Sequence, residues 1–253
     1  MSLSTLLVLA DGRLPSGAHA HSGGVEAAVA AGRIHDLPTL ESFLVGRTAT
    51  TGTVAAAFAA AACRALTSCA SSRVRADLEG LAFMDRSTRR TDGAALDPSD
   101  NLVERISALD DGIDARTASP ALRAASRAQG RALLRAVARI WPTATNPAGS
   151  HPHHPIATGI AAAAAGLGPQ NAALVAVYGG ITGSASAAVR LLGLDPYAVH
   201  ALVARLAPEC DRVAAEAAAR ADDPVDDLPA GSAILLDLDA EQHATWEVRL
   251  FAS

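Results

Sequence analysis

Histidine is the side chain in this sequence with the clearest capacity for metal chemistry. His151, His153 and His154 lie together in a proline-rich loop, and His19 and His21 lie near the amino terminus. Imidazole is the commonest ligand of transition metals, but a fixed site requires three or four ligands in a set geometry. The amino-terminal pair supplies only two ligands, fewer than a fixed site requires. We therefore predict no metal site, and direct nickel binding by these histidines is the alternative.

Nucleophilic and nucleotide-hydrolysing sites are not indicated either. Ser22, His21 and Asp11 could be drawn as a catalytic triad, but they lie too close in sequence to diagnose one. No GxSxG turn is present. All 21 basic residues are arginine, so the chain has no lysine for a P-loop, a Schiff base or a Ser–Lys dyad. We predict a protein without catalytic residues, and an undetected hydrolase is the alternative.

The composition predicts an all-α protein of a reducing compartment. Hydrophobic residues make up 50% of the 253 residues and aromatic residues only 3%, and alanine is the strongest helix former. The net charge is -5, whereas nucleic-acid-binding proteins usually carry a basic surface. Three cysteines without CxxC spacing fit a reducing compartment. No basic segment precedes the first apolar run, so we expect no secretory signal.

Two long uncharged runs, Thr48–Cys63 and Ala172–Val189, need to be weighed as membrane spans. A span requires about 20 predominantly apolar residues. The first run is too short to cross a bilayer, and the second contains several glycines, serines and threonines. We predict that both are buried helices of a soluble bundle and that the protein does not enter a membrane.

The amino-terminal histidines lie in a turn-rich segment, Leu9–Glu26, between two helical patterns. Glycine permits left-handed backbone and proline fixes φ, so the segment predicts a shaped loop that joins two helices, with Ser22 capping the second. Later helices are expected to begin at Asp36, Ser119 and Asp195, each an N-cap followed closely by proline.

The middle of the chain has less regular periodicity. The helix after Asp36 is expected to break at Gly46 and Gly52. Residues 85–117 carry clustered charges, glycines and a proline, and they predict only a short helix, Asn101–Leu109.

Charge patterns mark two further surfaces. Arginines recur every four residues between Pro120 and Trp141 and form a stripe that is either a solvated face or a surface for an acidic partner. An acidic segment with two prolines begins at Asp222 and is expected to leave the following tail mobile. We therefore divide the chain into a helical domain, residues 1–221, and a linker with a partner-binding tail, residues 222–253.

Several motifs resemble those of UreF-type urease accessory proteins. The family's opening pattern, LAD-x-x-LP-x-G-x-x-x-HSGG-x-E, is matched by Leu9, Ala10, Asp11, Leu14, Pro15, Gly17, His21, Ser22, Gly23, Gly24 and Glu26. Further resemblances follow in the family's order: the arginine-rich helix Ser119–Arg135, the pair His154-Pro155, the segment Ser184–Leu191 and the tail from His243.

The resemblance implies a single-domain, all-α bundle of roughly eight to ten helices with a flexible C-terminal tail. Proteins of this family are cytoplasmic, are not enzymes, dimerise, and bind UreD (also called UreH) and the GTPase UreG. The assembly acts on apo-urease to insert nickel. The resemblance implies that the chain is a scaffold that regulates the GTPase. It also implies that the chain binds no cofactor tightly and that the assembled complex transfers the nickel.

The resemblance also points to partner-binding residues. These are Asp11, His21, Ser22, Glu26, Arg127, Arg131, Arg190, His243, Arg249, Leu250 and Phe251. Aromatic residues and arginine are enriched at interface hot spots, so we expect the tail to become ordered when it binds UreD or UreG. His21 is expected to act as a positioning residue.

Overall fold

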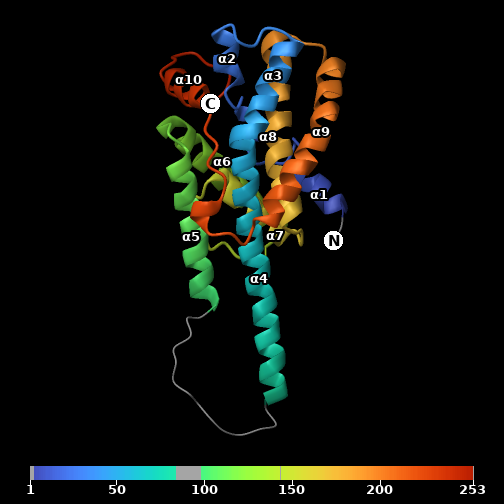
Figure 1. Cartoon of the computed structure of the whole chain (residues 1–253), viewed down its shortest axis with the longest axis vertical. Coiled ribbons are helices and arrows are strands. Elements are labelled where there is room, and N and C mark those ends of the chain that lie inside the picture. Colours follow the sequence, from blue (N-terminus) through green and yellow to red (C-terminus); the bar gives the residue numbers. More distant parts are fainter. Residues whose placement is uncertain (1–2, 84–97, 143, 253) are drawn as a thin grey trace.

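The computed structural model is a bundle in which α3, η2 and α4 together run nearly the length of the molecule, with α5 on one side and α8 and α9 on the other (Figure 1). The structure describes residues 3–83, 98–142 and 144–252. The elements in chain order are α1 (Leu3–Ala10), η1 (Ala18–Ala20), α2 (Val25–Ala30), α3 (Leu37–Arg47), η2 (Thr48–Gly52), α4 (Thr53–Phe83), α5 (Pro98–Arg116), α6 (Pro120–Ile140), α7 (His154–Ala164), α8 (Pro169–Leu192), α9 (Pro196–Ala219), η3 (Val225–Asp227) and α10 (Ile234–Ala244). These described residues contain no strand, so the all-α fold class is confirmed.

Helices α3 and α4 are joined by the π-helical turn η2 into one continuous rod, without the breaks expected at Gly46 and Gly52. The Thr48 hydroxyl donates to the Leu44 carbonyl oxygen at 2.7 Å inside this rod. A Cβ atom on Gly52 would lie 3.1 Å from the Arg47 carbonyl oxygen. The glycine therefore accommodates the widened turn and does not end the helix.

Small residues allow the central helices to approach closely. Where α7 crosses α4, a Cβ atom on Gly159 would lie 2.6 Å from the Ala59 carbonyl oxygen and 2.7 Å from the Ala62 Cβ atom. Larger side chains, such as Phe58 and Ile160, fill the space beside this contact and are fully buried. The alanine-rich composition thus produces a tightly packed bundle.

The two apolar runs lie in helices that the bundle partly covers. By length and composition alone, the helical stretches Leu37–Ser71 and Pro169–Leu192 could cross a membrane. Within their most apolar windows, 56% and 44% of the residues are buried inside the protein. Their apolar composition is therefore explained by packing between helices.

The predicted helix starts are confirmed. Asp36 accepts a hydrogen bond from the Thr39 N–H at 2.9 Å, and the Thr39 hydroxyl accepts one from the Asp36 N–H at 3.1 Å. The Ser119 hydroxyl accepts from the Leu122 N–H at 3.1 Å, and the Asp195 carboxylate accepts from the first turn of α9. Each start depends on neighbouring residues, which explains why the sequence predicts it.

Helix α5 is longer than the predicted helix Asn101–Leu109. It spans Pro98–Arg116, and its last turns carry two aspartates that bind α6, as described below. Ion pairs with α6 therefore stabilise the last turns of α5, which the local sequence does not predict to be helical. The remainder of this weakly patterned region, residues 84–97, lies outside the described residues.

The acidic segment after α9 is fixed to the bundle, which corrects the expectation of a mobile linker. Arg116 of α5 donates to the carbonyl oxygens of Val225, Leu228 and Pro229 at 2.7, 3.1 and 2.9 Å. The same guanidinium lies 5.1 Å from the centre of the Phe58 ring. The acidic side chains of this segment predict that it is solvated. Instead, its backbone carbonyl groups accept hydrogen bonds from the Arg116 guanidinium.

Helix α10 is likewise held in place, because it caps the amino terminus of α6. Glu241 accepts from the Ala121 N–H at 2.8 Å and from the Ser119 hydroxyl, and Asp237 accepts from the Ser119 N–H at 3.1 Å. The first N–H groups of a helix lack partners within it, and the helix dipole favours negative charge there. The described tail is therefore packed in the free chain, and the division at residue 221 stays a prediction.

Candidate partner-binding site

Glu26 lies at the centre of a site formed by the two ends of the chain. Its carboxylate accepts hydrogen bonds from the Leu250 N–H at 2.7 Å, from the Phe251 N–H at 3.0 Å and from the His243 Nε2–H at 2.8 Å. The Glu26 and His243 residues are only 8% and 3% exposed. The carboxylate thus joins the amino-terminal loop to the tail in a region from which water is largely excluded.

A glycine pair before α2 shapes the loop. Gly23 and Gly24 have φ values of +63° and +91°, in the left-handed region that favours glycine. A Cβ atom on Gly24 would lie 2.1 Å from the Leu236 Cδ1 atom, so any larger residue would displace the Leu236 side chain of α10. The Ser22 hydroxyl accepts from the Glu26 N–H at 3.3 Å, so Ser22 does support the start of α2, although Gly24 is the N-cap residue.

Two arginines from neighbouring helices bind the loop and the tail. Arg47 of α3 donates to the Gly23 carbonyl oxygen at 2.6 Å. Arg190 of α8 donates to the His19 carbonyl oxygen at 3.2 Å and places its guanidinium 4.6 Å from the centre of the Phe251 ring. The Ala252 N–H donates to the Ala20 carbonyl oxygen at 2.7 Å. We call His19–Glu26, Arg190 and His243–Ala252 together the loop–tail site.

The electrostatics of Glu26 favour its charged form. Burial raises the pKa of the carboxyl group, but the hydrogen bonds from Leu250, His243 and Phe251 outweigh burial and lower the pKa below its ordinary value of 4.5. At neutral pH the group is therefore a carboxylate that holds the tail.

The loop–tail site and the neighbouring helix α10 both carry exposed apolar side chains. Phe251 is buried, but Leu250 is 57% and Val248 is 89% exposed. On α10, Ile234, Leu235 and Leu238 are also exposed. Large exposed apolar side chains are available for protein–protein contacts. The arrangement can therefore present an anchored apolar segment to a partner.

The structure brings most of the predicted partner-binding residues together in this site. Those in the loop–tail site are His21, Ser22, Glu26, Arg190, His243, Arg249, Leu250 and Phe251. Asp11 instead pairs with Arg13 at 2.9 Å on the surface. Arg131 is exposed on α6, outside this group of contacts.

Arg127 binds within the protein. Its guanidinium donates to Asp110 at 2.7 Å and to Asp114, both on α5, and to the His151 carbonyl oxygen at 2.8 Å. The part of the arginine stripe that contains Arg127 is therefore a connection between α5, α6 and the histidine loop. Its assignment to a partner stays a prediction.

His153 of the histidine loop is also engaged in the fold. It is fully buried, its Nε2–H donates to Asp114 at 2.9 Å, and its Nδ1 accepts from the Ser126 hydroxyl at 3.0 Å. Burial lowers the pKa of His153, despite the neighbouring Asp114, so the ring is neutral at pH 7. An Asp–His–Ser arrangement of this kind lacks the accessible imidazole that catalysis requires, since substrate cannot reach His153.

The other histidines form no evident metal site. Burial, and secondarily the charge of His21, lowers the pKa of His154 to about 4. Among residues 3–83, 98–142 and 144–252, no group of three or more histidine, cysteine or acidic side chains could hold a metal ion. The alternative of direct nickel binding therefore receives no geometric support from the described residues.

Sequence analysis missed Arg47, Asp110, Asp114 and Arg116. Asp110 and Asp114 are four residues apart, a spacing that places both on one helix face, so this pair could have indicated an arginine-binding face. Arg47 and Arg116 bind backbone carbonyl groups of distant segments, and no sequence spacing signals such contacts.

Comparison with known proteins agrees with the sequence motifs. The family model described as UreF matches residues 34–207. Similar proteins named urease accessory protein UreF are 45% identical in Mycobacterium sp. (strain JLS), 43% identical in Mycolicibacterium vanbaalenii and 39% identical in Mycobacterium tuberculosis (strain H37Rv). Each comparison covers 100% of this chain and 99% of the relative, including both ends that form the loop–tail site. The chain therefore belongs to the UreF family of urease accessory proteins.

Proposed function

We propose that this chain is a non-catalytic scaffold for urease maturation. It binds UreD (also called UreH) and the GTPase UreG, regulates the GTPase and supports nickel insertion into apo-urease. Because the chain has no lysine, the nucleotide chemistry belongs to a partner. The nickel is cargo of the complex, and this chain binds no cofactor tightly.

The loop–tail site is the observation that carries the proposal. Glu26 fixes the backbone of Leu250 and Phe251, while Leu250 and Val248 remain exposed beside it. A segment already held in one conformation loses less conformational entropy on binding than a mobile one. The partner is therefore expected to bind a preformed surface made from both chain ends.

The cytoplasm is the proposed location, and a homodimer is the proposed assembly. Burial raises the pKa of the Cys63 thiol to about 12 and that of the Cys210 thiol to about 11, so both are unreactive core thiols. They are free cysteines, which supports a reducing compartment.

Co-purification with UreD and UreG, followed by urease activation, tests the proposal. In Glu26→Gln the amide cannot accept from all three donors, and a buried unpaired donor costs about 1–3 kcal/mol. We expect recovery of the partner that binds the tail to fall about tenfold, with a parallel loss of urease activation.

Glu41→Gln is the matched control, because Glu41 pairs with Arg205 on the surface at 3.2 Å. It should retain wild-type recovery and activation. If Glu26→Gln were recovered with both partners as well as Glu41→Gln, the loop–tail site would not be the partner-binding surface.

A further inference from the structure

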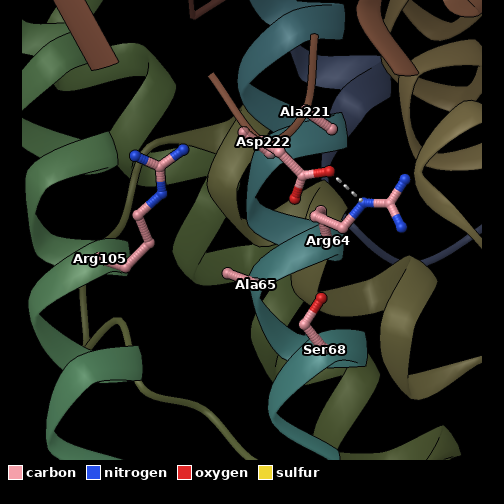
Figure 2. A pocket seen from close by; sticks show the side chains of 7 residues that line it. Arg64, Ala65, Ser68, Arg105, Ala221 and Asp222 are labelled. Carbon is pink, nitrogen blue, oxygen red and sulfur yellow. Dashed lines mark ion pairs between the residues drawn. The ribbon is translucent and has the colours of Figure 1, made fainter. Parts of the chain in front are cut away.

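A small cavity of about 140 Å³ lies between α4, α5 and the segment that follows α9 (Figure 2). None of its lining residues belongs to the loop–tail site. Its polar wall residues are Arg64, Ser68, Arg105 and Asp222, and its apolar lining is Ala61, Ala65 and Ala221.

The charges at this cavity are unbalanced, with two guanidinium groups and one carboxylate on its walls. The Asp222 carboxylate lies 3.4 Å from the Arg64 Nε atom, but its side chain is 78% exposed. An exposed ion pair of this kind is weak. The cavity therefore has a net positive charge that one loosely held carboxylate offsets only in part.

A buried hydrogen-bond donor at the cavity is unsatisfied among the described residues. Within the described residues, the Arg64 Nε atom is buried and makes no hydrogen bond. Arg105 donates to the Asp223 carbonyl oxygen at 2.6 Å, which uses one of its five N–H groups. Figure 2 shows the Ser68 hydroxyl directed from α4 toward Arg64 and Asp222.

We propose that this cavity binds a small oxyanion of the phosphate class. Arg64 Nε, Arg105 and Ser68 would donate to its oxygens, and it would displace the exposed Asp222 carboxylate. Guanidinium groups bind oxyanions with paired, charge-assisted hydrogen bonds. A volume of about 140 Å³ is sufficient for inorganic phosphate. This inference goes beyond the proposed scaffold function and does not depend on it.

Titration calorimetry with inorganic phosphate and the purified full-length chain tests the proposal. Arg105→Met is expected to abolish binding, and Asp222→Asn to bind phosphate about fivefold more tightly because a competing negative charge is removed. Arg131→Met is the matched control, since Arg131 is exposed on α6, and it should bind phosphate as the wild type does. Acetate at equal ionic strength should bind more weakly than phosphate.

Circular dichroism establishes that each variant is folded. Ser68→Ala provides a second, milder variant, for which about fivefold weaker binding is expected. The proposal is overturned if wild type, Arg105→Met and Arg131→Met bind phosphate equally or not at all. It is also overturned if Asp222→Asn binds phosphate more weakly, or if acetate binds as tightly as phosphate.

Discussion

A single buried carboxylate, Glu26, connects residues more than two hundred positions apart. It accepts two backbone N–H groups and one imidazole N–H, so one side chain satisfies three donors of the tail. Hydrogen bonds to charged groups contribute more than neutral ones. Sequence motifs identify Glu26 and His243 separately, but no spacing indicates that they meet.

The pH dependence of the tail follows from the lowered pKa of Glu26. Since the folded-state pKa lies below the ordinary 4.5, the stabilisation is complete above about pH 4.5 and is lost as the pH falls through the folded value. In a Trp141→Phe background, the fluorescence of Trp246 should report release of the tail in this acidic range. Trp246 suits this measurement because its ring lies 4.8 Å from that of His243.

Glu26→Gln in the same background removes the titrating group and should lack this acidic transition. An identical transition in both proteins would show that another group controls the tail.

At the scale of elements, helix starts could be predicted and helix contacts could not. The caps at Asp36 and Ser119 depend on the next three residues, which the sequence displays directly. The packed position of α10 depends on the amino terminus of α6 and on Arg116. The sequence therefore predicts a mobile tail from its acidic, proline-containing linker, while long-range hydrogen bonds hold it in place.

The glycine pair before α2 gives an element-scale prediction. Gly24→Ala introduces both a strained φ and a clash with Leu236. Gly32→Ala introduces strain alone, because Gly32 has a φ of +71° and open space around it. We expect Gly32→Ala to cost about 1 kcal/mol and Gly24→Ala clearly more.

Urea unfolding of both variants measures this difference. Limited proteolysis should also cut the tail faster in Gly24→Ala, since displacing the Leu236 side chain weakens the packing of α10. Equal stabilities and equal cleavage rates would contradict the close approach of α10 to the glycine pair.

At the scale of the whole molecule, composition and motifs predict the fold class and the family but not the shared site. An alanine-rich chain with few aromatic residues indicates a close-packed helical bundle, which the structure confirms. The loop and the tail stand out as motifs at opposite ends of the sequence. The loop and the tail contact each other only because α2, α8 and α10 pack together, and that packing depends on the complete bundle.

Hydrogen exchange at the Leu250 and Phe251 amides tests most directly the claim that Glu26 holds the tail in the free chain. Both amides donate to Glu26, so at neutral pH they should exchange slowly in the wild type and in Glu41→Gln. In Glu26→Gln they should exchange about tenfold faster or more, while amides in the core of α4 stay unchanged. Fast exchange of both amides in the wild-type chain without partners would contradict the account.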